Sequence, residues 1–177
     1  MKYFEPKTIM IEKGFLSFGS NLGDKEANIA GAITALSTFH EISDLQSASF
    51  YNSPPLYNMK QPDFLNTVVN YTTTFSPFEL FDACQNVEKL LGRPAKRDKN
   101  TPRSIDIDIL TYGTSFIETD ELKIPHPDLA NRKFVLVPWA ELAPDEIVPV
   151  FNVTVQDLLS VCIDPSIVTK HIMEKNA

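Results

Sequence analysis

The sequence predicts an α+β fold: a ferredoxin-like (βαββαβ) antiparallel sheet with helices packed on one face, followed by a C-terminal extension. One observation behind this prediction is the order of the apolar patterns, which runs strand, helix, strand, strand, helix, strand. The other is the length of 177 residues, which suits one compact domain. We therefore expect a single domain over 1–177, with 1–13 as a lead-in and 151–177 as the extension.

The first half of the chain supplies a strand, a helix and an extended segment. The apolar run at 15–18 ends at Gly19 and indicates a strand. Asp24 is expected to cap a helix over 25–39, where apolar residues recur every three or four positions. Residues 45–51 are rich in Ser, Phe and Tyr and are expected to be extended.

The second half completes the sheet. A strand is predicted over 64–74, where side chains alternate between two faces. The segment 76–79 (Ser-Pro-Phe-Glu) has the pattern of a capping box, and its helix should end before Gly92. The alternating segment 105–110 predicts the last strand, and the chain from 125 onward mixes short helices with prolines.

Composition excludes several classes of function. The chain has 16 Lys and Arg against 23 Asp and Glu, a net charge of −7, which argues against a broad nucleic-acid or acidic-membrane surface. No run approaches the ~20 apolar residues of a membrane helix. The two cysteines lack CxxC spacing, which argues against a disulfide framework or a zinc site. Residues 1–6 lack the apolar core of a signal peptide. We expect a cytoplasmic protein with small-molecule partners and with neither nucleic acid nor membrane as partner.

The strongest local signal is Asp106-Ile107-Asp108. Residues two apart on a strand point to the same face, ~6.5–7 Å apart along it. Ile107 and its neighbouring isoleucines pack the opposite face, so the two carboxylates are held side by side. A divalent cation relieves their repulsion, and hard oxygen ligands suit Mg²⁺. The alternative is a strand with a solvated acidic face.

A basic loop runs directly into this strand and favours the Mg²⁺ site over a solvated acidic face. It holds three of the four arginines of the chain. Such a loop beside a metal-binding pair indicates a polyphosphate held between Mg²⁺ and guanidinium groups, whereas the alternative is a solubilising loop. Its cationic residues are Lys89, Arg93, Lys96, Arg97, Lys99 and Arg103.

Three weaker features accompany these two. Phe64 and Asn66 project from one face of their strand, and an aromatic ring beside a carboxamide suits a flat heterocycle, although an ordinary polar face is the alternative. The turn 19–23 follows a strand like a phosphate-binding turn but lacks the Walker lysine and GxGxxG. His126 stands alone, which is more typical of a structural hydrogen-bonding residue than of a metal ligand.

Taken together, these segments resemble the 6-hydroxymethyl-7,8-dihydropterin pyrophosphokinase family (HPPK) of folate biosynthesis. The matching segments occur in family order over about 14–150 and make the resemblance specific. They are Gly19-Ser20-Asn21-Leu22-Gly23, Phe50-Tyr51-Asn52-Ser53-Pro54-Pro55, Gln61-Pro62-Asp63-Phe64-Leu65-Asn66, Glu88 with Gly92-Arg93, 102–110, Pro125-His126-Pro127 and Asn131-Arg132-Lys133-Phe134.

The resemblance implies an enzyme that transfers the β,γ-pyrophosphate of ATP to the hydroxymethyl group of the reduced pterin and releases AMP. It implies two Mg²⁺ ions held by Asp106 and Asp108, with Arg93 and Arg103 stabilising charge on the transferred group. The pterin-binding residues that it implies are Ser53, Pro54, Leu56, Phe64, Asn66, Asp106 and Phe134. The ATP-binding residues that it implies are Gln85, Glu88, Arg97, Ile109, His126 and Arg132.

The chain departs from the family pattern around the loops that close over the substrates. Ala95 stands where many members have an arginine, and Asn100-Thr101 replaces an aromatic-glycine pair. Glu121, Lys123 and Pro127 also differ. Two alternatives therefore stay open: a non-catalytic pterin- or nucleotide-binding relative, and another Mg²⁺-dependent phosphotransferase on the same fold. The resemblance further implies a monomer.

Overall fold

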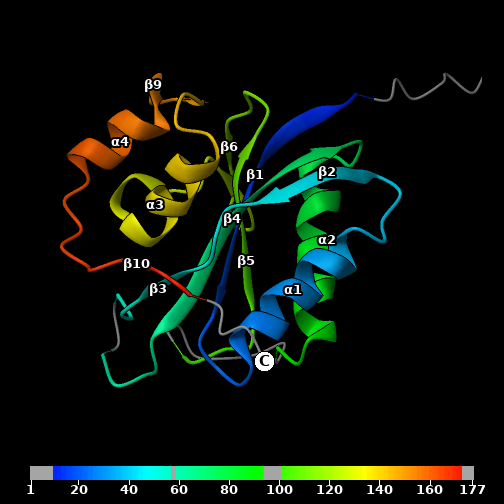
Figure 1. Cartoon of the computed structure of the whole chain (residues 1–177). Coiled ribbons are helices and arrows are strands. Elements are labelled where there is room, and N and C mark those ends of the chain that lie inside the picture. Colours follow the sequence, from blue (N-terminus) through cyan, green and yellow to red (C-terminus); the bar gives the residue numbers. More distant parts are fainter. Residues whose placement is uncertain (1–9, 57–58, 94–100, 173–177) are drawn as a thin grey trace, which may run out of the picture.

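An antiparallel sheet lies between two layers of helices in the computed structural model, which describes residues 10–56, 59–93 and 101–172 (Figure 1). The mixed α+β class and the antiparallel sheet are as predicted. Along the described chain the elements are β1 (Glu12–Ser20), α1 (Lys25–Leu36), β2 (Ile42–Ser47), β3 (Tyr51–Ser53), β4 (Phe64–Thr73), α2 (Pro77–Leu90), β5 (Asp106–Tyr112), β6 (Ile117–Glu118), β7 (Lys123–Ile124), η1 (Leu129–Asn131), α3 (Lys133–Leu142), β8 (Ile147–Val148), β9 (Val153–Thr154), α4 (Val155–Val161) and β10 (Thr169–Lys170).

The strand order within the described sheet is β10-β3-β4-β1-β5, and β2 also pairs with β4. The extended segment predicted over 45–51 is in fact two strands, because β2 and β3 pair with different parts of β4. Between them the backbone N–H of Ser49 donates to the carboxylate of Glu141 on α3. The chain therefore leaves the sheet at that point, which a local pattern does not reveal.

Helices α1 and α2 pack on one face of the sheet, as predicted. Asp24 caps α1 by accepting from the Ala27 N–H at 3.0 Å, and the capping box of Ser76 and Glu79 begins α2. Helix α1 ends at Leu36 and not at Phe39. Gly92 follows α2 with φ of 87°, the left-handed conformation expected after a helix end.

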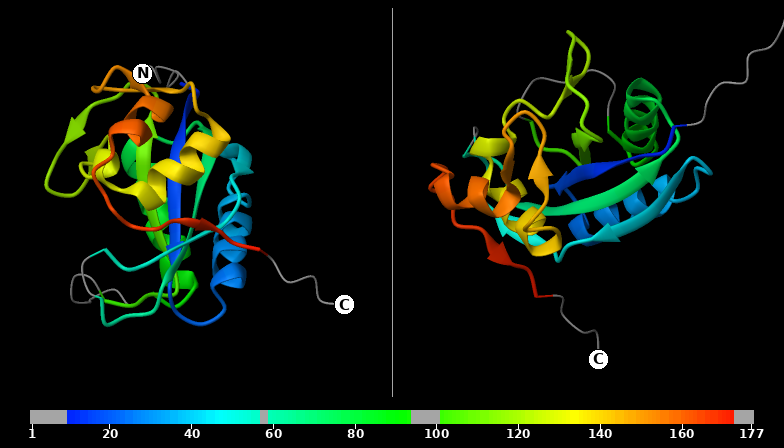
Figure 2. Two further views of the ribbon diagram at one scale, coloured as in Figure 1. Left: turned by 60° about the vertical axis from the view of Figure 1, so that its left-hand side comes forward. Right: turned by 90° about the horizontal axis from the view of Figure 1, so that it is seen from above.

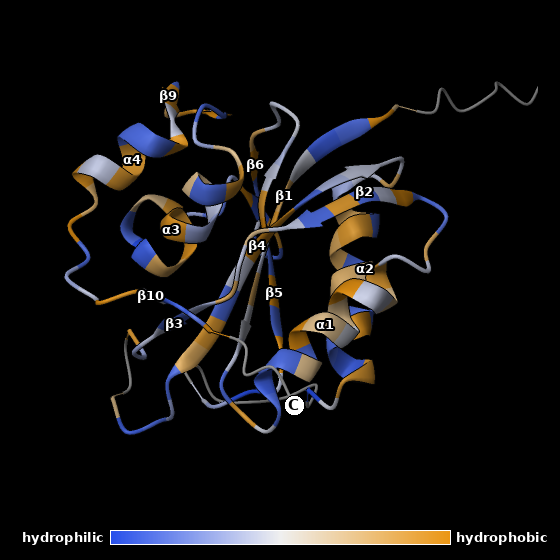
Figure 3. Ribbon diagram, in the orientation of Figure 1, coloured by the Kyte–Doolittle hydropathy of each residue, from blue (hydrophilic) through white to orange (hydrophobic). Residues whose placement is uncertain are grey.

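The prediction of helices on only one face is wrong, because α3 and α4 cover the opposite face (Figure 2). Phe15, Val68 and Leu110 point to that second face, where they pack against the fully buried Trp139 of α3 in a second hydrophobic cluster. Figure 3 shows hydrophobic residues in both helical layers. Each central strand thus buries side chains on both faces in its middle, so neither face is left to solvent there.

The end of the described chain returns to the sheet. Strand β10 pairs with β3 through Thr169 with Asn52 and Lys170 with Tyr51. Across the described residues, none of the helices combines the length and the apolar character needed to span a membrane.

Candidate active site

One face of the sheet changes from apolar to polar along the three central strands. Phe15, Val68 and Leu110 lie in the hydrophobic core under α3. Further along the same face, Gly19 of β1 pairs with Asp106 of β5 on one side and with Asn66 of β4 on the other. The candidate site is the row formed by these last three residues.

Asp106 and Asp108 project from the same face of β5, as predicted, while Ile107 packs into the core on the opposite face. Arg93 approaches Asp106 with Nη2 to Oδ1 at 2.7 Å, and Arg103 with Nη2 to Oδ2 at 2.5 Å. The Asp106 side chain is 13% exposed. Both predicted catalytic arginines are therefore in direct ion-pair contact with one of the predicted metal ligands.

Glu88 of α2 holds Arg93 and the β5 backbone in place. Its carboxylate is buried, accepts from the Ile107 N–H at 2.7 Å and forms an ion pair with Arg93. A buried carboxylate with a guanidinium and a backbone donor has partners for its charge. Glu88 therefore ties the end of α2 to the strand that carries both aspartates.

Asn21 holds Arg103 in the same way, and the sequence reading did not single it out as a site residue. Its Oδ1 accepts from the Arg103 N–H at 2.8 Å, and its own N–H donates to the Arg103 carbonyl at 3.1 Å. Its Nδ2 donates to Oε1 of Gln61 and to the Pro62 carbonyl. An amide side chain in the turn that follows a buried strand was the available signal.

Asp108 contacts two other predicted site residues. Its Oδ2 lies 3.3 Å from Nη1 of Arg132 and 3.9 Å from Nε2 of His126. Burial raises the pKa of Asp108, and the Asp106 carboxylate raises it further, against the lowering effects of His126 and Arg132. Burial also lowers the pKa of His126. Burial therefore favours a neutral His126 imidazole, while the neighbouring Arg132 favours the charged form of the Asp108 carboxylate.

The opposite end of the row has the character of a ring-binding surface. Asn66 is buried and donates to Oγ of Ser53 at 2.9 Å. The Arg103 guanidinium carbon lies 5.1 Å from the centre of the Phe64 ring. A Cβ atom at Gly19 would lie 3.3 Å from Oδ1 of Asn66 and 3.8 Å from Cδ1 of Phe64. A side chain at this position would therefore crowd the carboxamide and the ring.

The remaining predicted site residues differ in position and burial. Phe134, at the start of α3, has its ring 5.9 Å from the Arg132 guanidinium carbon. Pro54, Leu56 and Gln85 are half-buried, the first two just after β3 and the last on α2. The Ile109 side chain lies in the core on the other face, which leaves only its backbone to meet a ligand. Arg97, with Ala95 and Asn100, lies outside the described residues.

The residues present fit a magnesium ion that arrives with phosphate. Among the described residues no three His, Cys, Asp or Glu side chains form a metal-binding group, so the two aspartates need further ligands. Mg²⁺ commonly takes one or two carboxylates and completes its shell with substrate phosphates and water. Arg103 and Arg132 each keep a buried Nε–H without a hydrogen-bond partner in the described structure, beside the same carboxylates. Hard oxygen ligands and guanidinium groups with an unused donor thus lie next to each other.

Comparison with known proteins shows the family to which this chain belongs. The profile described as 7,8-dihydro-6-hydroxymethylpterin-pyrophosphokinase (HPPK) matches residues 15–144. The chain is 38% identical over 154 residues to the 2-amino-4-hydroxy-6-hydroxymethyldihydropteridine pyrophosphokinase of Methylorubrum extorquens, covering 87% of this chain and 95% of that protein. It is also 38% identical over 135 residues to the enzyme of the same name from Haemophilus influenzae, covering 76% of this chain and 84% of that one.

Longer proteins also match. The folic acid synthesis protein fol1 of Schizosaccharomyces pombe is 40% identical over 145 residues, which are 82% of this chain but only 20% of that protein. The crystal structure of wild-type Plasmodium falciparum HPPK-DHPS with pterin and p-hydroxybenzoate shares the fold, with a TM-score of 0.68 at 14% identity over 88% of this chain and 44% of that chain. The chain therefore belongs to the 7,8-dihydro-6-hydroxymethylpterin pyrophosphokinase family, whose enzymes transfer pyrophosphate from ATP to hydroxymethyldihydropterin in folate biosynthesis.

Proposed function

We propose that this chain is itself a 2-amino-4-hydroxy-6-hydroxymethyldihydropteridine pyrophosphokinase, with ATP and 6-hydroxymethyl-7,8-dihydropterin as its substrates. The observation that carries the proposal is the row Asp106–Gly19–Asn66. It sets charged, phosphate-type chemistry and ring-type recognition side by side on one face of a rigid sheet. A transfer between a triphosphate and a heterocyclic alcohol needs both within a few ångströms.

The phosphate half of the reaction is assigned to the arginines and aspartates. The pterin hydroxyl oxygen bonds to the β-phosphorus while the bond from that phosphorus to the α,β-bridging oxygen breaks, so AMP leaves and the hydroxyl proton passes to water. Arg93 and Arg103 stabilise charge on the transferred group, and they already lie 2.7 and 2.5 Å from Asp106. Arg132 and His126, beside Asp108, orient the nucleotide. Asp106 and Asp108 would hold two Mg²⁺ ions, which would neutralise charge on the triphosphate when bound.

The pterin half is assigned to the other end of the row. Phe64 and Phe134 stack on the two faces of the ring, and the carboxamide of Asn66 pairs with its edge. The Asn66–Ser53 hydrogen bond of 2.9 Å supports this role, because it fixes the orientation of the carboxamide before the ring enters. Pro54 and Leu56 complete the wall beside Ser53.

The proposal includes three finer points. We assign β1, α1, β2 with β3, β4, α2 and β5 to a ferredoxin-like layer, which the strand order supports. Gln85 and Glu88 are placed on the nucleotide side, although Glu88 acts through Arg93. We also propose a monomer, because both halves of the site come from one chain.

The test is AMP formation from Mg-ATP and the reduced pterin, followed in a coupled assay with a verified pyrophosphokinase in a parallel tube. The expected result is AMP release that requires both the pterin and Mg²⁺. Calorimetric titration with the pterin accompanies the assay. Binding without AMP release, while the control enzyme is active, would instead identify a non-catalytic pterin-binding relative and overturn the proposal.

A further inference from the structure

Strand β3 carries one wall of the proposed pterin pocket, yet it is short and lies toward the edge of the sheet. It spans only Tyr51–Ser53, and its outer neighbour β10 contributes two residues. Strands of this length have few ladder hydrogen bonds to hold them in place. The position of Ser53, and with it the orientation of Asn66, therefore depends on contacts from outside the sheet.

Those contacts converge on one carboxylate of α3. Glu141 Oε1 accepts from the backbone N–H of Ser49 at 3.0 Å and from its hydroxyl at 2.7 Å. Glu141 Oε2 accepts from the Tyr51 hydroxyl and lies 3.4 Å from Nζ of Lys170 on β10. Helix α3 also carries Phe134, the opposite wall of the proposed pocket. One side chain thus links the two walls.

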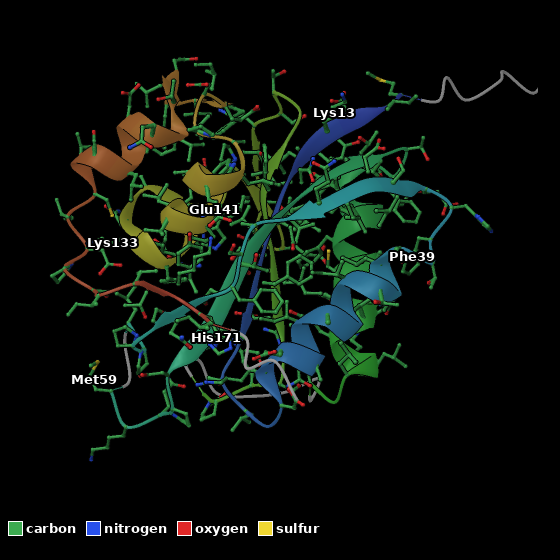
Figure 4. The ribbon with its side chains drawn as sticks, in the orientation of Figure 1. Lys13, Phe39, Met59, Lys133, Glu141 and His171 are labelled. Atoms are coloured by element: carbon green, nitrogen blue, oxygen red, sulfur yellow. The ribbon has the colours of Figure 1, made fainter. Side chains whose placement is uncertain are left out.

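A second contact holds the other face of the same strand. Nδ1 of His171 lies 3.1 Å from Nδ2 of Asn52, and its Nε2 lies 2.6 Å from Oε1 of Glu26 on α1. Its backbone N–H donates to the Phe50 carbonyl at 2.8 Å. When the Asn52 amide donates to Nδ1, the proton sits on Nε2 and points to Glu26. Figure 4 labels both anchors, Glu141 on α3 and His171 just after β10.

We propose that Glu141 and His171 form a brace that positions β3 and thereby sets the affinity for the pterin substrate. The inference rests on the proposed function for its substrate. The side chains of Glu141 and His171 bond to Ser49, Tyr51, Lys170, Asn52 and Glu26, which lie outside the row Asp106–Gly19–Asn66, so both are positioning residues. The brace acts mainly on the pterin wall, because Arg93 and Arg103 are held instead by Glu88 and Asn21.

The test separates the two substrates. In Glu141→Ala we expect the KM for the pterin to rise about tenfold, with kcat and the KM for ATP changed by less than about threefold. Tyr51→Phe and His171→Ala should shift the pterin KM in the same direction by about threefold each. Glu141→Gln should keep the KM for the pterin close to that of wild type. Its amide oxygen still accepts from Ser49, and its NH₂ group can donate to the Tyr51 hydroxyl.

The matched control is Glu146→Ala, which removes an exposed acid just beyond the end of α3 and should change neither KM. Circular dichroism verifies the fold, and Tyr51→Phe, which removes a single oxygen, replaces Glu141→Ala if the latter does not fold. Equal shifts in both KM values, or unchanged pterin KM in folded Glu141→Ala, would overturn the brace. If wild type forms no AMP, the proposed function fails, and the brace is then judged by the calorimetric Kd for the pterin in the same variants.

Discussion

The proposed pterin pocket beside Asn66 further implies that the ring lies over Gly19 of β1, and Gly19→Ala tests this placement. Gly19 sits in the centre of the row, between Asp106 and Asn66, and its backbone needs no positive φ. An alanine fits this strand conformation and recovers about 0.5–1 kcal/mol of the entropy cost of a strand glycine. The new Cβ lies 3.3 Å from Oδ1 of Asn66, a tight contact that offsets part of that gain. We expect the free energy of unfolding to stay within about 1 kcal/mol of wild type.

Activity should respond much more strongly than stability. A methyl group at this position takes the space that the ring needs and displaces it by about 1 Å, and misplacement of that size costs on the order of 100-fold, or ~2.7 kcal/mol, in transition-state stabilisation. We expect kcat/KM for the pterin to fall by about that factor, while the KM for ATP changes less than about threefold.

The assay is steady-state AMP release with either substrate varied, together with urea unfolding followed by Trp139 fluorescence. Gly31→Ala is the matched control, because Gly31 lies on α1, on the far side of the sheet, where a Cβ would have an ordinary 3.7 Å contact with Leu91. That variant should keep full activity. A Gly19→Ala enzyme with near-normal pterin efficiency would refute the placement of the ring over β1.

Three further predictions concern the metal pair, the second core and the acid side of the pH range. Asp108→Ala should lower kcat by several powers of ten while leaving the fold intact by circular dichroism; near-normal turnover would contradict the two-metal proposal. Trp139→Ala should lower the free energy of unfolding by about 3–5 kcal/mol in urea titrations, because the fully buried ring packs 5.1 Å from Phe15. Despite the opposing effect of burial, hydrogen bonds from Tyr51 and Ser49 lower the pKa of Glu141 to about 2, so its charged form stabilises the fold above pH 4.5 and that contribution disappears as the pH falls toward 2. Glu141→Gln should therefore lose less stability than wild type between pH 6 and pH 3, and equal losses would argue against this assignment.

Local signals predicted the elements whose cause is local. The caps at Asp24 and Ser76 and the stop at Gly92 were found because a few consecutive residues determine them. The shared face of Asp106 and Asp108 followed from the two-residue period of a strand, and their catalytic role stays a prediction.

The features that the sequence reading missed are long-range. Asn52 and Thr169, paired between β3 and β10, are separated by more than a hundred residues, and two-residue strands have no recognisable period. The bond between Asn21 and Arg103 joins two turns that meet only once β1 and β5 are paired. The helices on the second face are not predicted, because Asn66 and Asn70 give that side of the strand a polar pattern although Val68 between them is buried under α3.

That second face also bears on the alternative of a solvated acidic strand. On an open sheet both carboxylates, Asp106 and Asp108, would be hydrated by bulk solvent, and water and salt would screen their repulsion. Because α3 and the segment before it cover this face, Arg132 and His126 are brought to Asp108, and Asp106 is left 13% exposed between two arginines. The partly covered pair of like charges is thus accompanied by three guanidinium groups, from Arg93, Arg103 and Arg132. The covering layer thus makes the solvated acidic strand the weaker explanation of this pattern, and it supports the proposed role of the two aspartates toward a metal-bound triphosphate.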